Sequence, residues 1–473
     1  MLFSPSPRRR RLQLRISERR LLLMFGDAIA VMLAVLISLF IWAQVADRTF
    51  DVEFVFPRIS WFFALVVLWL LLAAANDYYQ LSLAARRIAS FQRLGVITVQ
   101  LIFIYLIVFF LSSRDSLPRL FIIYYGISSF LLISVWRLVN PALIGWASEP
   151  RKVLIIGTDW STETIIGAVR EQAETIYEIR GIIGQQETVG QRIASIPIIG
   201  DGGDLMNFVI RDGITEIIFT SSPDLSDEIF RGVMEAYERG VVLTPMPLLY
   251  ERLTGRVPVH HVKSNWALVL PISGDSLFDL YPVVGWLLDT ILALIGLIAF
   301  IITLPLIALI IRLNSPGGTF YTQKRLGMNG KVFTIIKYRT MVKDAEVGTG
   351  AVFSEKGDMR VTNVGRIMRK TRLDELPQVI NILRGDMSVV GPRPERPEHV
   401  VRLTEKIPFY RTRLVVRPGL TGWAQVKYAY GSTDEDAEVK LEYDLYYVRH
   451  RSLFLDLNII VRTVGKVLRM SGV

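Results

Sequence analysis

Long apolar runs are the feature that most constrains this chain. They fall at residues 21–45, 59–75, 94–111 and 117–139, with a fifth at 290–311. Each of the first four is near the roughly 17 to 25 apolar residues that a helix needs to cross a bilayer. The chain of 473 residues is 51% hydrophobic, which is high for a soluble protein. We therefore expect four transmembrane helices in an N-terminal domain over residues 1–145.

Basic residues beside these runs predict the orientation of the domain. Arg19 and Arg20 precede the first run, and Arg86, Arg87 and Arg93 follow the second. Because Lys and Arg are retained on the cytoplasmic side, both ends of the domain should lie in the cytoplasm. The same bias accounts for much of the net charge of +10. No nucleic-acid partner is expected, since the chain shows no basic and aromatic recognition module.

Residues 146–250 have the pattern of a soluble α/β domain. Short buried-strand runs alternate with helix-like segments, and the runs lie at 153–156, 181–183, 216–220 and 241–245. This alternation predicts a small parallel sheet of Rossmann type. The segment Gly-Thr-Asp-Trp-Ser-Thr from Gly157 has one glycine where a dinucleotide fingerprint needs three. A structural or regulatory module is therefore favoured over a cofactor site, and residues 251–275 are expected to be a linker.

The fifth apolar run is expected to enter and leave the membrane on the same side. Basic residues follow it between 312 and 331, and the positive-inside bias opposes carrying them across. Pro305 lies inside the run and removes a helical hydrogen bond, while Asp289 just before it is costly to bury in lipid. These observations predict a re-entrant helix over about 284–311, broken at Pro305, in a domain over residues 276–473. An ordinary fifth span is the alternative.

A cationic segment in this domain leads directly into two adjacent acids. A helix over 364–372 would place three cations on one side, namely Arg366, Arg369 and Lys370. The acids Asp374 and Glu375 follow, and adjacent acids on a surface helix are otherwise commonplace. Cations beside carboxylates suit a phosphorylated substrate and a hard divalent cation, with Mg²⁺ the first choice in a chain without cysteine. A carboxylate can also be a nucleophile that forms an acyl phosphate.

Other segments of the domain carry cations among turn residues. Strand alternation over 332–341 would place Lys337 and Arg339 on one face, where they could hold phosphates; an ordinary solvated edge strand is the alternative. The final stretch, residues 453–470, is amphipathic and could lie in the membrane interface.

Five of these segments, in this order, resemble the bacterial sugar transferase family. They are Gln323-Lys-Arg-Leu-Gly, Lys337-Tyr-Arg-Thr-Met, Arg372-Leu-Asp-Glu-Leu-Pro-Gln, Gly391-Pro-Arg-Pro-Glu and Arg417-Pro-Gly-Leu-Thr-Gly-Trp-Ala-Gln. More specifically, the whole chain looks like a large monotopic phosphoglycosyl transferase, also called a polyprenyl glycosylphosphotransferase. One departure is Leu304 before Pro305, where small relatives favour serine; the helix break needs only the proline.

The resemblance implies transfer of hexose 1-phosphate from a UDP-sugar, glucose or galactose before the N-acetylated sugars, to undecaprenyl phosphate, with release of UMP. It implies Asp374 as nucleophile and Glu375 as its partner, with Mg²⁺ at this pair. Substrate or phosphate contacts would come from Gln323, Arg325, Lys337, Arg339, Arg369, Lys370, Asp386, Arg393, Arg417 and Gln425. The family further implies a homodimer in the bacterial inner membrane, its catalytic domain on the cytoplasmic face, that starts exopolysaccharide, capsule or O-antigen synthesis.

Two other functions fit the sequence less well. A membrane-bound nucleotide-sugar dehydratase or epimerase would need a glycine-rich NAD loop and a Tyr-x-x-x-Lys pair, and the sequence has neither. A membrane scaffold or regulator with an inactive transferase domain is disfavoured because Asp374, Glu375 and the basic motifs are all present.

Overall fold

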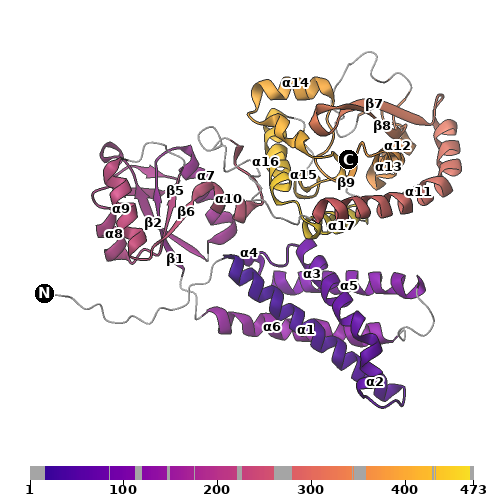
Figure 1. The fold of residues 1–473 in the computed structure, drawn as a ribbon, viewed down its shortest axis with the longest axis horizontal. Helices are drawn as coiled ribbons and strands as arrows, with labels where there is room; N and C mark the ends of the chain where they lie inside the picture. The colour runs from indigo at the N-terminus through magenta and orange to yellow at the C-terminus, as the bar shows by residue number, and fades with distance from the viewer. Residues whose placement is uncertain are drawn as a thin grey trace. The chain divides into compact units, whose positions relative to one another are not determined.

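The computed structural model of the chain describes residues 16–84, 86–111, 120–145, 150–174, 176–220, 226–259, 280–342, 345, 358–428, 431 and 433–468. The chain forms two compact units, residues 1–254 and 255–473 (Figure 1). The first unit contains a bundle of helices followed by an α/β sheet, and the second contains one long apolar helix and the segments that carry the cation and acid motifs.

The helical part of the first unit is built mainly from four long helices. Its elements are α1 (Ile16–Val45), α2 (Val52–Val55), the 3₁₀ helix η1 (Phe56–Arg58), α3 (Ile59–Ala75), α4 (Leu81–Ala84), α5 (Arg87–Leu111) and α6 (Phe121–Gly145). Helix α1 packs against α3 and α6, and α5 packs against the same two helices. The four long helices therefore close into a bundle.

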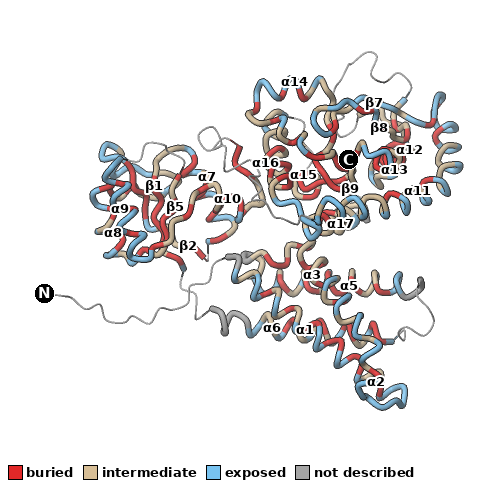
Figure 2. Tube along the Cα trace, in the orientation of Figure 1, coloured by how far each residue is buried: buried red, intermediate tan, exposed pale blue. Residues whose placement is uncertain are grey.

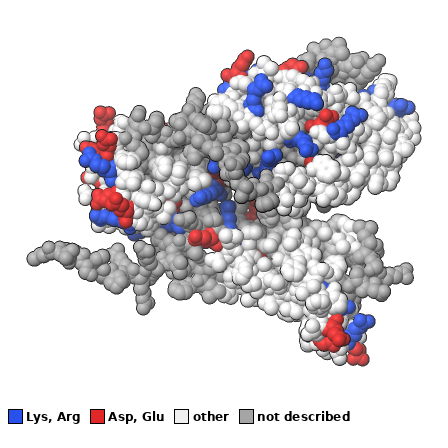
Figure 3. Space-filling view, in the orientation of Figure 1, with Lys and Arg blue, Asp and Glu red and all other residues white. Residues whose placement is uncertain are grey.

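These four helices cover the apolar runs that the sequence places in the membrane. Within the described residues, five helices are long and apolar enough to span a bilayer: the four of the bundle and a fifth over Tyr281–Asn314. On the face shown in Figure 3, the bundle is nearly free of charged side chains except around the short helix α2. The number of actual crossings stays a prediction, because length and composition do not fix it.

One ion pair lies inside the bundle and was not expected from the sequence. The Arg137 side chain of α6 lies 2.7 Å from the Asp27 carboxylate of α1, and both side chains are almost fully buried. The Arg137 guanidinium also lies 4.1 Å from the centre of the Tyr78 ring. A charge in an apolar bundle is costly unless it is paired, so the pair links α1 to α6.

The α/β part contains a six-stranded sheet. Its strands are β1 (Arg151–Ile156), β2 (Tyr177–Ile183), β3 (Arg192–Ile193), β4 (Ile196–Gly200), β5 (Glu216–Phe219) and β6 (Val242–Pro245). The order across the sheet is β3-β4-β2-β1-β5-β6, and all neighbours are parallel except the β3–β4 pair. The sequence predicted β1, β2, β5 and β6 and missed β3 and β4, because β3 has only two residues and Pro197 inside β4 argues against a strand.

Helices cover both faces of this sheet, as expected for a parallel sheet. They are α7 (Trp160–Ala173), α8 (Leu205–Asp212), α9 (Asp227–Glu238) and α10 (Met246–Thr254). Successive residues of β1 point to opposite faces, so Val153 packs with α7 and α10 whereas Leu154 packs with α8 and α9. Figure 2 shows the resulting buried centre of the sheet.

The expected linker over residues 251–275 is ordered at its start. Helix α10 extends to Thr254, and the next residues belong to the second unit. Val257 and Val259 are buried there beside Leu445, and the Val257 N–H donates to the Glu442 carbonyl. Apolar side chains thus fix this part of the segment, while residues 260–279 lie outside the described residues.

The first helix described in the second unit is α11 (Tyr281–Asn314), which runs through Pro305 without ending. Figure 1 shows its axis changing direction along its length. One side packs on the rest of the unit through residues such as Ala293 and Phe300, while much of the other side exposes apolar side chains. Gly296 permits close packing, because a Cβ there would lie 2.8 Å from the Val379 side chain.

Both ends of α11 contact the same unit. Near its start, the Tyr281 hydroxyl donates to the Asp456 carboxylate at 2.8 Å. One-quarter of the way along, the Asp289 carboxylate accepts from the Val389 N–H, also at 2.8 Å. Just after its end, the Ser315 carbonyl accepts from the Arg339 side chain at 2.7 Å. The helix therefore lies along this unit rather than projecting from it.

The remaining elements of the second unit are short. They are β7 (Phe320–Leu326), η5 (Met328–Gly330), β8 (Val332–Tyr338), α12 (Asn363–Thr371), η6 (Leu373–Gln378), α13 (Val379–Leu383), β9 (Ser388–Val390), α14 (Pro397–Lys406), η7 (Tyr410–Val415), β10 (Gly419–Thr421), α15 (Trp423–Lys427), α16 (Asp434–His450) and α17 (Leu453–Leu468). Strands β7 and β8 form an antiparallel hairpin, and β9 pairs in parallel with β10.

Candidate active site

The two adjacent acids lie in the 3₁₀ helix η6, directly after α12. Arg372 ends α12 in the left-handed conformation, with φ of 56°, and this residue reverses the chain into η6. The turn brings Asp374 and Glu375 into the interior, where only 8% and 7% of their surfaces are exposed. Buried adjacent carboxylates repel each other, so the pair needs compensating charge from elsewhere in the fold.

Three cations from three segments supply that charge to Glu375. Its Oε1 accepts from Lys337 Nζ of β8 at 3.1 Å and from Arg393 Nη2 at 3.0 Å. Its Oε2 lies 3.4 Å from Arg372 Nη1. By contrast, among all contacts of the described residues, the Asp374 side chain takes part in no hydrogen bond or ion pair. The two acids are therefore chemically unequal.

The β9–β10 pair positions Arg393. The Gly391-Pro-Arg-Pro turn follows β9, and the Gly419 N–H donates to the Pro392 carbonyl at 2.9 Å. Glycine is required at both positions, since a Cβ on Gly391 would lie 2.4 Å from the Arg417 carbonyl and one on Gly419 would lie 2.1 Å from Gly391 N. This close approach explains why two glycine-containing motifs, far apart in the sequence, belong to one site.

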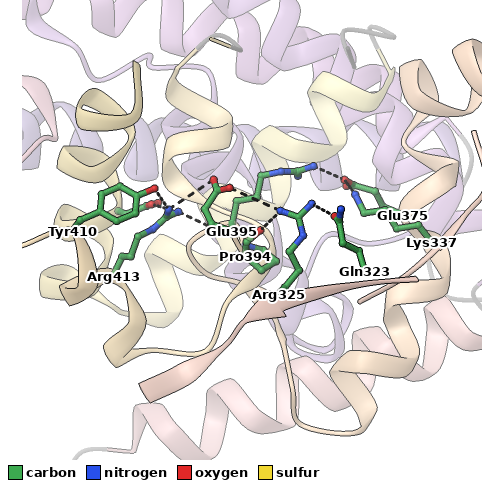
Figure 4. A network of polar contacts seen from close by, with 10 residues as sticks. Gln323, Arg325, Lys337, Glu375, Pro394, Glu395, Tyr410 and Arg413 are labelled. Atoms are coloured by element: carbon green, nitrogen blue, oxygen red, sulfur yellow. Dashed lines mark hydrogen bonds and ion pairs between the residues drawn. The ribbon is translucent and has the colours of Figure 1, made fainter. Parts of the chain in front are cut away.

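A buried guanidinium holds the same turn from the other side (Figure 4). Arg413, whose side chain is 5% exposed, donates to the Arg393 carbonyl at 3.0 Å and to the Tyr410 hydroxyl at 2.9 Å. Its charge is balanced by Asp444, 2.7 Å away. Arg325 of β7 donates to the Pro394 carbonyl at 3.1 Å. Hydrogen-bonded charge networks of this kind fix a backbone in one conformation.

A small pocket that opens to the surface lies beside Glu375. It is lined by Arg325, Ile335, Lys337, Glu375, Gln378, Arg393, Pro394, Gly419 and Leu420. Three of these residues are cations, and guanidinium and ammonium groups converging on one pocket are typical of phosphate recognition. The pocket therefore has the chemistry of a phosphate-binding site next to an acid pair.

The surroundings separate the pKa values of the two acids. Burial, and then the negative charge of Glu375, raises the pKa of Asp374 from 3.8 to about 6, against the positive charges of Lys337 and Arg369. Burial alone would also raise the pKa of Glu375, but Lys337, Arg393 and Arg372 lower it well below its ordinary value. Glu375 is thus a fixed anion near neutral pH, and Asp374 is a carboxyl that ionises within the physiological range.

The acid pair fits a divalent cation only in one coordination mode. Among the described residues, no cluster of three or more His, Cys, Asp or Glu side chains can hold a metal. Mg²⁺ is commonly held by one or two carboxylates together with substrate phosphates. Asp374 and Glu375 can supply such ligands, so the site suits a metal that arrives with a phosphorylated substrate rather than one caged by protein.

Most of the basic residues expected at the site do reach it, but not all of them. Arg325, Lys337 and Arg393 line the pocket. Gln323 lies next to it and accepts from the Arg325 guanidinium at 2.5 Å. Arg369 lies within electrostatic range of Asp374 and donates to the Thr340 hydroxyl.

Other expected residues lie elsewhere. Strand β8 ends at Tyr338, so strand alternation does not extend to Arg339, which instead donates to carbonyls just after α11. Lys370 is solvent-exposed and Asp386 half-buried, and neither lines the pocket. Gln425 donates to the Leu420 carbonyl at 3.5 Å. Arg417 contributes its backbone to the glycine contact described above.

Sequence reasoning missed three residues that build the site. Gln378 is 2% exposed and lines the pocket one helical turn after Glu375. Asn381 is fully buried and joins α13 to β8, since it accepts from the Ile336 N–H and donates to the Thr334 carbonyl. Arg413 is the third. The spacing after Glu375 could have indicated Gln378, whereas only the fold brings Arg413 to the turn.

The turn between β1 and α7 lies where a Rossmann fold usually binds a dinucleotide. The Asp159 carboxylate caps α7 by accepting from the Ser161 N–H. A Cβ on Gly157, whose φ is 118°, would lie 1.9 Å from the Thr220 hydroxyl. The Asp159 carboxylate and the Thr220 side chain thus lie at the position where a Rossmann fold usually receives a pyrophosphate. The residues at this turn do not fit a phosphate there.

Two family profiles match the chain. That of the bacterial sugar transferases matches residues 280–470, and that named CoA-binding domain matches residues 74–247. A UDP-glucose:undecaprenyl-phosphate glucose-1-phosphate transferase of Caulobacter vibrioides is 44% identical over 183 residues, which are 38% of this chain and 68% of that protein. The acid pair, the cationic pocket and this similarity define the class, and the chain belongs to the bacterial sugar transferase family.

Two longer relatives match beyond the transferase segment. A UDP-N-acetylgalactosamine-undecaprenyl-phosphate N-acetylgalactosaminephosphotransferase of Aeromonas hydrophila is 38% identical over 254 residues, 53% of this chain and 59% of that protein. A UDP-glucose:undecaprenyl-phosphate glucose-1-phosphate transferase of Xanthomonas campestris is 33% identical over 291 residues, 59% and 58% of the two chains. The matches thus cover somewhat less than two thirds of these two proteins.

Proposed function

We propose that the chain transfers hexose 1-phosphate from a UDP-sugar to undecaprenyl phosphate and releases UMP. The observation that carries this proposal is the inequality of the acid pair. Glu375 is fixed by three cations, whereas the carboxylate of Asp374 engages no partner among the described residues. An unengaged carboxylate beside a cationic pocket suits attack on a phosphorus atom. The family membership and the substrates named for the relatives support the same reaction.

The reaction would proceed in two displacements on phosphorus. In the first, an Asp374 oxygen attacks the phosphorus that carries the sugar, and the bond from that phosphorus to the bridging oxygen of UMP breaks. The products are an acyl phosphate on Asp374 and UMP. In the second, an oxygen of the lipid phosphate attacks the same phosphorus, and Asp374 leaves as a carboxylate. Lys337 and Arg393, which line the pocket, would offset charge on the phosphoryl oxygens in both steps.

Mg²⁺ at the acid pair is part of the proposal. When bound, it would neutralise phosphate charge and orient the diphosphate. Asp374 and Glu375 are the carboxylates at the site that would hold it, together with substrate oxygens.

The contacts of α11 support a helix that does not cross the bilayer. At about 1.5 Å per residue, a helix of this length reaches roughly 50 Å, more than a membrane core. Yet contacts near both of its ends are made with the same unit. If α11 crossed the membrane, that unit would have to lie on both sides. We therefore propose that α11 is re-entrant and that the acid pair faces the cytoplasm at a bacterial inner membrane.

The transferred sugar is proposed as a hexose, with UDP-glucose or UDP-galactose as the first donors to test. Two of the three relatives described above are named for glucose 1-phosphate transfer and one for N-acetylgalactosamine. A place at the start of exopolysaccharide, capsule or O-antigen synthesis, and assembly as a homodimer, are further parts of the proposal.

Trapping the acyl phosphate tests the proposal directly. The full chain in nanodiscs would be mixed with sugar-labelled UDP-glucose or UDP-galactose in the absence of lipid acceptor. Label should remain on the denatured protein, with one UMP released per labelled chain, and Asp374→Ala should abolish both signals. Glu405→Gln, an exposed acid on α14, is the matched control and should label like the wild type. Label that persists on Asp374→Ala would refute the assignment of the nucleophile.

A further inference from the structure

Asp289 is an acidic residue in the apolar helix α11, and its carboxylate is hydrogen-bonded to strand β9. Asp289 Oδ1 accepts from the Val389 N–H at 2.8 Å and from the Ser388 hydroxyl at 2.9 Å. The two donors are adjacent residues of β9, 99 and 100 residues further along the chain. A carboxylate in an apolar helix is costly unless hydrogen bonds compensate it, so these contacts account for an acid in this position.

Strand β9 leads directly into the turn that carries Arg393. Val390 ends the strand, and Arg393 is the third residue after it. Arg393 lines the pocket and donates to Glu375 Oε1 at 3.0 Å. Since consecutive Cα atoms are held about 3.8 Å apart, a displacement of Val389 is passed along four peptide bonds to Arg393.

One edge of β9 is paired with β10, and the other edge faces α11. The Ser388 N–H donates to the Pro418 carbonyl, directly before β10, at 2.9 Å. The N–H groups of successive strand residues point to opposite edges, so the Val389 N–H points away from β10. Within the part of the chain that the structure describes, β9 and β10 form a sheet of two strands, with no third strand to accept from Val389. Asp289 takes the place of that missing acceptor.

An apolar cluster packs around this contact. Ala293, one helical turn after Asp289 on α11, is buried with Met387 and with Ile335 of β8, and Val389 packs against them. Ile335 also lines the pocket. Closely packed interiors transmit small displacements, so α11, β9 and the wall of the pocket are mechanically linked.

We propose that Asp289 is a positioning residue for Arg393. By fixing β9 to α11, its carboxylate holds the turn after β9 in the place where Arg393 reaches Glu375 and the pocket. The inference rests on the proposed function, in which Arg393 offsets charge on the phosphoryl oxygens. Asp289 acts through Arg393 and not on the reacting atoms. Because α11 is the helix proposed to enter the membrane, the same contact ties its placement to the geometry of the active site.

Amide hydrogen exchange of the full chain in nanodiscs tests the attachment of β9 without any substrate. Asp289→Ala removes the acceptor of both hydrogen bonds. The segment over residues 387–394 should then exchange about 10- to 100-fold faster, the effect of losing a hydrogen bond to a charged group. Exchange in the β7–β8 hairpin should stay within about twofold of wild type. Asp289→Asn keeps Oδ1, so its β9 should remain protected.

A double-mutant cycle tests the action through Arg393. Exchange of labelled UMP into the UDP-sugar reports the first half-reaction alone. Asp289→Ala should lower its rate by about 10- to 100-fold, because a small misplacement of a phosphate-binding cation costs this much. In an Arg393→Gln background the further loss should be below about threefold. Asp289→Asn should stay within about threefold of wild type.

The matched control is Thr290→Ala. The Thr290 hydroxyl donates within α11, to the Trp286 carbonyl at 2.8 Å. Its removal changes the neighbouring residue of the same helix without touching β9, so both kinds of exchange should remain as in the wild type.

An Asp289→Ala variant with wild-type UMP exchange would overturn the inference. So would an equal fold loss in the wild-type and Arg393→Gln backgrounds, because the two residues would then act independently. Amide exchange that rises equally in β9 and in the β7–β8 hairpin would assign Asp289 a general structural role and reject the inference as well. A wild-type chain without UMP exchange would instead refute the proposed function, while amide exchange would still decide whether Asp289 holds β9.

Discussion

Replacing the proposed nucleophile should make the protein more stable while it abolishes activity. The pKa of Asp374 is raised from 3.8 to about 6 by burial and by Glu375. The native state therefore holds the proton more tightly than the unfolded state does. The stability that comes from the protonated form is fully present below pH 3.8 and is lost as the pH rises through about 6. Asp374→Asn keeps a neutral side chain of the same shape at every pH.

The size of the effect follows from the shift. A difference of about 2 pKa units, at about 1.36 kcal/mol each, gives a variant more stable than wild type by about 3 kcal/mol near pH 7.5. Near pH 5 the advantage should fall to about 1.5 kcal/mol, because the native wild type is then mostly protonated. For a unit of this size, about 3 kcal/mol corresponds to a Tm increase of roughly 6–12 °C.

Denaturation of the full chain in detergent, followed at several pH values between about 5 and 8, measures this difference. The pH dependence separates ionisation from any change in packing, which would be the same at every pH. Glu405→Gln, which removes an exposed acid, should change stability by less than about 0.5 kcal/mol. If Asp374→Asn is no more stable than the wild type, or if its extra stability does not grow with pH, the reasoning is refuted. The mechanism depends on an Asp374 carboxylate that is buried and repelled by Glu375.

Three further outcomes are expected. The first half-reaction should lose activity as the pH falls through about 6, because Asp374 is then protonated. Glu375→Gln should move this loss of activity to lower pH, because it removes the adjacent negative charge. The rate of UMP exchange, measured against pH, tests both outcomes. In the bundle, Arg137→Met should cost about 3–5 kcal/mol by leaving Asp27 unpaired, whereas the double variant with Asp27→Leu should recover most of that loss in thermal denaturation. Chelation with EDTA should stop UMP release and added Mg²⁺ should restore it; full activity in the chelator would contradict a metal at the acid pair.

The sequence predicted the elements of this protein better than the contacts between them. Apolar run length predicted the long helices, and strand-helix alternation predicted the parallel sheet. The acid pair was located at a helix end, as observed. These features depend on local periodicity and spacing, which a single sequence carries.

Features that depend on distant residues were not predictable. Arg339 was expected beside Lys337, but β8 ends between them and Arg339 binds carbonyls after α11. Arg413 lies 20 residues from the carbonyl it holds, and the Asp27–Arg137 pair spans 110 residues. Such contacts are decided by how elements pack, and no local pattern records them.

The three-sided attachment of Glu375 has a consequence for biogenesis. Its cations come from β8, from the α12 end and from the turn after β9, so Lys337 lies 38 residues before it in the chain and Arg393 lies 18 after. A nascent chain that has emerged only as far as Glu375 cannot yet fix the acid pair. The acid pair and its three cations therefore come together only after the segment beyond Arg393 has been synthesised and folded.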